Sequence, residues 1–136
     1  MKKYVHGIAQ KPGKPFLFGS FPETLVFGFP GNPASTLICF NLFFIPWLHQ
    51  YLGIPHKKYS AQLQEDVQFN KPLSYHLLVT ISLDKSCLMA TPLQNSGSGD
   101  LIHLGQADAV ISLPSENNIF LAGEVYPIFP LKKNLL

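Results

Sequence analysis

The sequence predicts an α+β fold: a few strands and one long helix, followed by a small all-β unit that is either a barrel or a sandwich. Two observations carry this prediction. The apolar run Leu25–Phe29 stops at a Pro-Gly pair and leads into a long apolar segment with helix signals. Beyond Lys58, short stretches of mixed polarity alternate with turns at intervals of about ten residues, which is typical of short strands. We therefore expect one domain at residues 1–58 and a second at residues 59–136.

The first predicted domain opens with strands around an irregular loop. We expect strands at Val5–Ala9, Phe16–Gly19 and Thr24–Phe29. Lys11–Pro15 must be a loop, because two prolines and a glycine within five residues prevent regular structure.

A long helix should follow, from Pro33 to about Tyr51. Asn32 is a favoured N-cap, and proline is well tolerated at the first helical position. Pro46 lacks the N–H of a helix interior, so we expect a kink or local break there. Because its apolar residues cover almost the full circumference, the helix is expected to be buried on all sides. Gly53 should end it.

The second predicted domain consists mainly of short strands. A hairpin turn is expected at residues 84–86 and one or two helical turns at Asp100–Gly105. The expected strands are Ala61–Phe69, Tyr75–Leu83, Cys87–Pro92, Ala109–Leu113 and Val125–Phe129.

The composition is apolar for so short a chain. Of its residues 46% are hydrophobic and only 13% are charged, and 11 are phenylalanine. Such a chain has more apolar surface than it can readily enclose, so we expect a missing partner surface. The net charge is +2, and all ten basic residues are scattered lysines, which argues against nucleic-acid binding.

Cysteine use and targeting signals favour a cytoplasmic protein. Cys39 and Cys87 lie far apart and indicate neither a disulfide framework nor a metal site. The N-terminus lacks the apolar core of a signal peptide, and the apolar run Ala34–Leu48 is too short to span a bilayer. The five histidines show no paired metal spacing, and no residue order indicates nucleophilic catalysis.

The turn at Pro30–Ser35 is the first candidate site. A strand that enters a helix through a tight turn leaves several N–H groups pointing at one place, where the helix dipole adds partial positive charge. The turn is therefore either a seat for an anion or simply a well-capped turn.

Two segments, Gln10–Pro15 and Pro30–Ser35, resemble motifs of the molybdopterin molybdenumtransferase family, which includes the bacterial MoeA proteins and the E domain of gephyrin. A third, Gly97-Ser98 followed by a short helix and Ala109–Pro114, is similar to the C-terminal barrel domain of that family. The resemblance covers nearly the whole chain but only about the last third of a family member.

The resemblance implies that residues 1–58 form the C-terminal part of a three-layer α/β molybdopterin-binding domain, and that residues 59–136 form a β-barrel. It implies a cleft for molybdopterin and molybdate, with Lys11 and Lys14 as cations. The other residues that it carries into the cleft are Pro30, Gly31, Asn32, Pro33, Ser35 and Ser98. No residue of this chain is assigned a catalytic role.

The chain also departs from the family pattern. It has no arginine, and Gly7 stands where many members have a further lysine, so molybdate binding should be weaker. The Mg²⁺ ligands and the pterin loop of the family lie upstream of the segment that this chain resembles. The resemblance implies a homodimer and a missing N-terminal region as partner, and we expect no independent turnover by this chain alone. A non-catalytic interaction module and a structural fragment remain open alternatives.

Overall fold

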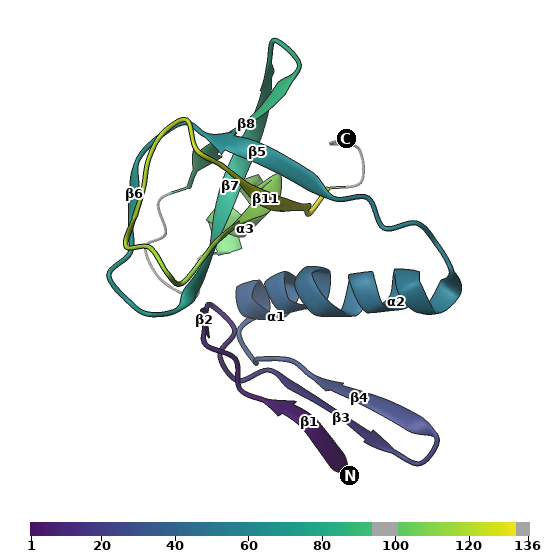
Figure 1. The fold of residues 1–136 in the computed structure, drawn as a ribbon. Helices are drawn as coiled ribbons and strands as arrows, with labels where there is room; N and C mark the ends of the chain where they lie inside the picture. Colours follow the sequence, from purple (N-terminus) through teal and green to yellow (C-terminus); the bar gives the residue numbers. More distant parts are fainter. Residues whose placement is uncertain (94–100, 133–136) are drawn as a thin grey trace.

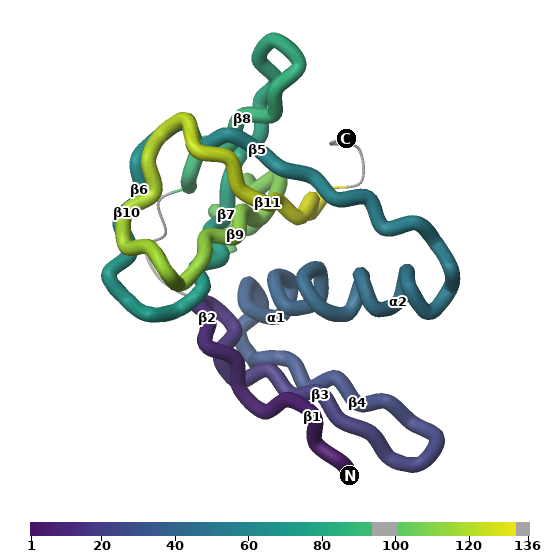
Figure 2. Tube along the Cα trace, viewed as in Figure 1, coloured from purple at the N-terminus to yellow at the C-terminus, as the bar shows by residue number. Residues whose placement is uncertain are grey.

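The computed structural model describes residues 1–93 and 101–132. It arranges them in three layers (Figures 1 and 2). A small sheet formed by the first strands lies on one side of a long helix, and a β-barrel lies on the other. An α+β fold with one long helix and a barrel is therefore confirmed.

The first layer is a three-stranded antiparallel sheet with the order β1-β3-β4. Its strands are β1 (Lys2–His6), β3 (Leu17–Phe21) and β4 (Thr24–Gly28). The first strand begins earlier than predicted, because it pairs with β3 at Lys2↔Ser20 and the chain turns away at Gly7. The two-residue strand β2 (Gln10–Lys11) belongs to the barrel sheet instead.

The second layer is one continuous helix that runs from Pro33 to Leu52. It consists of α1 (Pro33–Cys39), a π-helical turn η1 (Phe40–Phe44) and α2 (Ile45–Leu52). In the π turn the Ile45 N–H donates to the Phe40 carbonyl, five residues back. The local break expected at Pro46 thus occurs as a π turn directly before the proline.

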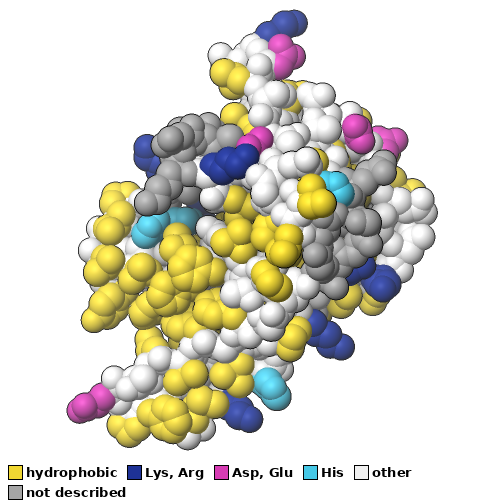
Figure 3. Space-filling model, turned by 180° about the vertical axis from the view of Figure 1, so that it is seen from behind, with side chains coloured by type: hydrophobic (Ala, Val, Ile, Leu, Met, Phe, Trp, Pro, Cys, Tyr) yellow, Lys and Arg dark blue, Asp and Glu magenta, His cyan; other side chains and the backbone are white. Residues whose placement is uncertain are grey.

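The expectation that this helix is buried on all sides is wrong. The buried residues lie in α1, whereas the π turn and α2 have none, and Tyr51 is 74% exposed. Aromatic residues of this half contact the sheet: the Phe27 ring centroid lies 5.2 Å from Phe44 and 5.1 Å from Trp47. The narrow sheet leaves the rest uncovered, and hydrophobic side chains gather on this face of the molecule (Figure 3).

The third layer is a closed five-stranded barrel. Its strands pair in the order β7-β8-β5-β11-β9, and β9 pairs back with β7, which closes the ring. The short strand β2 adds to β7 in parallel, and β6 (Val67–Gln68) pairs with β10 (Ile119–Phe120). The helix α3 (Leu101–Gln106) precedes β9. The barrel strands are β5 (Tyr59–Leu63), β7 (Ser74–Asp84), β8 (Cys87–Pro92), β9 (Ala109–Leu113) and β11 (Val125–Pro130).

Both faces of β7 and β9 are covered. Alternate residues point into the barrel, where Val79, Ile111 and Phe120 have no exposed surface. The outward residues Leu78 and Val110 are buried against Ile38 of the long helix. The barrel therefore has a core of its own and a second contact with the helix.

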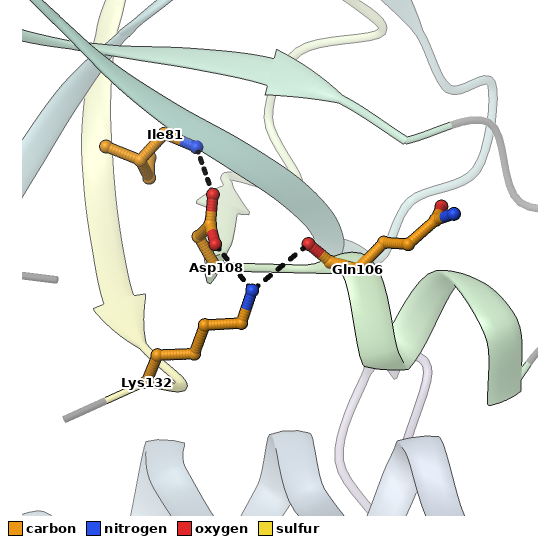
Figure 4. Close-up of polar contacts among 4 residues, drawn as sticks. All are labelled: Ile81, Gln106, Asp108 and Lys132. Atoms are coloured by element: carbon orange, nitrogen blue, oxygen red, sulfur yellow. Dashed lines mark hydrogen bonds and ion pairs between the residues drawn. The ribbon is translucent and has the colours of Figure 1, made fainter. Parts of the chain in front are cut away.

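A polar contact ties the end of the described chain to the barrel (Figure 4). Lys132 Nζ lies 2.7 Å from Asp108 Oδ1, and Asp108 Oδ2 accepts a hydrogen bond from the Ile81 N–H at 2.9 Å. Partial burial opposes ionisation of Asp108, but the hydrogen bonds from Lys132 and Ile81 and the Lys132 charge outweigh it and lower the pKa. The segment after β11 is thereby fixed to β7 and β9.

Among the described residues, no helix has the length and the hydropathy that a membrane crossing would require.

Candidate functional site

The lysine loop, residues 11–14, lies where the barrel and the helix meet. Strand β2 places it there, because Lys11 pairs with Tyr75 at the start of β7. The loop returns toward the sheet through the Lys14 carbonyl, which accepts hydrogen bonds from the N–H groups of Ile8 and Phe16 at 2.9 Å each. The side chains of Lys11 and Lys14 are exposed, so both ammonium groups are accessible to a ligand.

Gly13 allows the loop to lie against helix α1. Its φ is +96°, a conformation that side chains rarely adopt. A methyl group at this position would come within 2.5 Å of Cys39 Sγ and 2.8 Å of Gln10 Nε2. Burial raises the pKa of the Cys39 thiol to about 11, against a lowering hydrogen bond from Gln10, so Cys39 is a neutral core residue and not a nucleophile. The lysine loop is thus joined to the helix that the Pro-Gly turn begins.

The turn at Pro30–Ser35 is fixed by its own side chains. Asn32 Oδ1 accepts a hydrogen bond from the Ser35 N–H at 3.1 Å, which confirms the predicted N-cap. Thr36 Oγ1 donates to the carbonyl oxygens of Pro30 at 2.5 Å and Asn32 at 3.0 Å. Pro30 and Ser35 are buried, and Gly31 and Pro33 are exposed. The turn is therefore hydrogen-bonded to its own side chains, and the cap engages its Ser35 N–H.

An aromatic pair lies beneath the first lysine of the loop. Lys11 Nζ is 5.8 Å from the centroid of the Phe69 ring, which stacks on Tyr75 at 4.1 Å between centroids. A cation above an aromatic face is attracted by the ring quadrupole. Burial raises the pKa of Tyr75, which therefore stays neutral. The barrel thus contributes a seat for the Lys11 ammonium group.

A buried polar group on the barrel wall was missed by the sequence analysis. His76 is 7% exposed, and both of its ring nitrogens are hydrogen-bonded, to Gln10 of β2 and to Ser112 of β9. Burial lowers the pKa of His76 to about 4, so the imidazole is neutral at pH 7. The available signal was a single polar residue in the otherwise apolar run that ends at Val79.

The structure therefore joins two of the three predicted site segments. The Gly13 carbonyl oxygen lies 3.9 Å from Cys39 Sγ. Cys39 is four residues beyond Ser35 and so roughly 6 Å along the helix from the end of the turn. Ser98 lies outside the described residues. Gly7, where the resemblance implies a further lysine, has a φ of +86°, a conformation in which a lysine would be strained.

A groove elsewhere on the molecule contains none of the predicted site residues. It has a volume of about 720 Å³ and lies between α2 and β11. His49 and His56 line it, with their Nδ1 atoms 3.0 Å apart. The sequence did not predict this pair, because the end of the helix between them brings them together. In the described part of the chain, no group of three or more His, Cys, Asp or Glu side chains could hold a metal ion.

Comparison with known proteins assigns the chain to a family. Residues 60–131, more than half of it, match the sequence model of the MoeA C-terminal region (domain IV). A molybdopterin molybdenumtransferase of Synechocystis sp. is 38% identical over 130 residues, which cover 93% of this chain and 31% of that protein. The molybdenum cofactor synthesis protein cinnamon of Drosophila melanogaster is 31% identical over 138 residues, covering 90% of this chain and 22% of that protein.

The fold has solved counterparts. The crystal structure of a molybdopterin biosynthesis MoeA protein from Pyrococcus horikoshii matches with a TM-score of 0.77 and 32% identity, over 96% of this chain and 32% of that chain. This chain therefore spans about a third or less of the length of these relatives.

Proposed function

Because the chain belongs to the MoeA family, we propose that it acts in molybdenum cofactor biosynthesis, as the C-terminal part of a molybdopterin molybdenumtransferase. In this role it helps to bind molybdopterin and molybdate while molybdate is inserted into the dithiolene. The observation that carries the proposal is the contact of Cys39 Sγ with the Gly13 carbonyl oxygen at 3.9 Å, which joins the lysine loop to the helix that begins at the Pro-Gly turn.

The lysine loop, the Pro30–Ser35 turn and Ser98 have different roles in binding the substrate. Lys11 and Lys14 are exposed cations that neutralise molybdate or the molybdopterin phosphate. The turn from Pro30 to Ser35 is held by its own hydrogen bonds and shapes the pocket, so its backbone need not reorganise when the oxyanion arrives. A hydroxyl at Ser98 closes the cleft and donates to an oxyanion oxygen.

The first part of the chain is completed by other parts of the same enzyme. Residues 1–58 belong to an α/β pterin-binding domain whose remaining strands come from an upstream region of the same enzyme. That region covers the exposed side of α2 and the free edge of β4, where Tyr51, Leu52 and Leu25 are exposed. Mg²⁺ is bound by the upstream region, and the enzyme is a homodimer.

The test of this function needs a full-length enzyme. We would replace the C-terminal part of the Synechocystis relative by this chain and measure molybdenum cofactor formation in cells that lack their own molybdenumtransferase. We expect cofactor formation, and we expect Lys11→Ala to reduce it about tenfold, because one charge-assisted contact to the substrate is lost.

The matched control is Lys85→Ala, which removes the same charge at the exposed tip of the β7–β8 hairpin, away from the loop (Figure 1). It should leave cofactor formation unchanged. Equal activity of the Lys11 and Lys85 variants would exclude Lys11 as a substrate contact.

The exposed apolar face favours a second candidate, a module that associates without turnover. Phe21, Leu25, Tyr51 and Leu52 are all at least 45% exposed. Light scattering on the isolated chain tests this candidate: a strict monomer at high concentration contradicts it, whereas self-association is expected for both candidates.

A further inference from the structure

A directed chain of hydrogen bonds runs from the barrel into the lysine loop. The Ser112 hydroxyl donates to Nδ1 of His76 across 2.8 Å, and Nε2–H of His76 donates to Oε1 of Gln10 across 3.1 Å. Gln10 Nε2 then donates to the Gly13 carbonyl oxygen at 3.1 Å and lies 3.5 Å from Cys39 Sγ. Every donor points the same way, from β9 toward the loop.

The chemistry of the groups fixes these directions. The amide oxygen of Gln10 can only accept, so His76 must carry its proton on Nε2. The Nδ1 atom of the neutral ring is then an acceptor, and the Ser112 hydroxyl donates the hydrogen bond to it. Neutrality agrees with the low pKa of about 4 that burial gives His76. Gln10 is 2% exposed, so water cannot replace any lost partner.

The loop is held at both ends by its backbone, because Lys11 pairs with Tyr75 and the Lys14 carbonyl accepts two hydrogen bonds. Lys11 and Lys14 are exposed, and Gly13 has no side chain to pack. Its position therefore depends on hydrogen bonds to its backbone, and the bond from Gln10 to Gly13 is made in its centre by a buried side chain. Gln10 also directly precedes Lys11 in β2, so the same side chain influences both ends of the Lys11–Gly13 segment.

We propose that Gln10 and His76 are positioning residues: they lock the lysine loop onto β7 and so hold Lys11 where it meets the anionic substrate. The inference rests on the proposed function in one respect, because it takes Lys11 as the group that contacts the anion. Neither side chain touches the substrate, and both act through the Gly13 carbonyl.

The test uses the whole chain with two substitutions, alone and together. His76→Leu removes the ring from the network, and Gln10→Met keeps the volume of the side chain but removes its donor and acceptor. His76→Gln is the conservative variant, because its amide can still donate to Gln10. The matched control is Gln62→Met, since Gln62 Nε2 also donates to a glycine carbonyl, that of Gly123 at 2.9 Å, on the opposite strand pair of the barrel.

Two quantities are measured on variants that circular dichroism shows to be folded. The first is the backbone amide resonances of Lys11, Gly13 and Lys14 in nuclear magnetic resonance spectra. The second is the affinity for molybdate alone, by equilibrium dialysis. We expect His76→Leu to shift the loop resonances although its ring bonds to Gln10 and Ser112 and not to the loop. In the Gln10→Met background the same substitution should shift them little further, because the path is already broken.

Molybdate affinity should fall by about two- to tenfold in both variants, the range expected for one net hydrogen bond. His76→Gln should restore most of it, and Gln62→Met should change neither quantity. Loop resonances and affinity that match the Gln62 variant in both His76→Leu and Gln10→Met would overturn the proposal. If the unaltered chain binds no molybdate while His76→Leu still moves the loop, the positioning inference is supported and the anion-binding function fails.

Discussion

The barrel and the segment before it solve the problem of a small core in different ways. The barrel closes its sheet on itself and buries aliphatic residues completely, as Val79 and Ile111 show. The first 58 residues form an open sheet and a helix that meet through aromatic rings, and Phe44 and Trp47 are only half-buried. A closed sheet has no free edge, whereas an open one needs a cover. The barrel is therefore expected to be the self-sufficient part of this chain.

The largest expected effect is a difference in stability loss when one phenylalanine in each region is replaced by alanine. Phe120→Ala empties a fully buried site in the barrel and should cost about 4 kcal/mol of unfolding free energy. Phe44→Ala removes a half-buried ring from the helix and should cost about 1 kcal/mol, because much of its surface already meets water. Urea unfolding followed by far-ultraviolet circular dichroism measures both. Equal losses would contradict the difference in self-sufficiency.

The next effect concerns the seam between the two regions. The pKa of His76 is about 4 in the folded chain and 6.5 in a free side chain. As the pH falls below 6.5, the unfolded chain takes up a proton that the folded chain refuses, so stability decreases until about pH 4. The full loss corresponds to about 3 kcal/mol.

Unfolding free energies measured between pH 7 and pH 4 check this prediction. In His76→Gln the dependence of unfolding free energy on pH should lose the contribution of His76, because no imidazole remains to titrate at this position. An unchanged slope in the variant would assign the acid sensitivity to other groups.

The smallest effect tests the start of the helix within the less covered region. Asn32→Ala removes the cap on the Ser35 N–H and should cost about 1 kcal/mol. Asn41→Ala in the same helix removes a bond to the Leu37 carbonyl but gains helix propensity, so it should be nearly neutral. Thermal unfolding of both variants makes the comparison. Equal changes in melting temperature would mean that the cap does not stabilise the helix.

The sequence predicted the elements better than their environment. Strands Cys87–Pro92 and Ala109–Leu113 and the N-cap at Asn32 agree with the structure, because short-range patterns govern them. The burial of the long helix was misjudged, since an apolar circumference states what a helix could bury and not what covers it. For the site, the Lys11 and Pro30 segments came from motif resemblance; Gln10 was only the first residue of its motif, and no pattern indicated a role for His76.

What the sequence determined by itself is the chain's local order: where strands stop, where the helix starts at Asn32, and which segments carry lysine and the Pro-Gly turn. These features depend on residues only a few positions apart. The tertiary structure alone decided that Gln10 meets His76, 66 positions away, and that β9 closes the ring with β7. Such contacts require strand register across the whole barrel, and no local pattern encodes which distant partner a buried polar side chain will find.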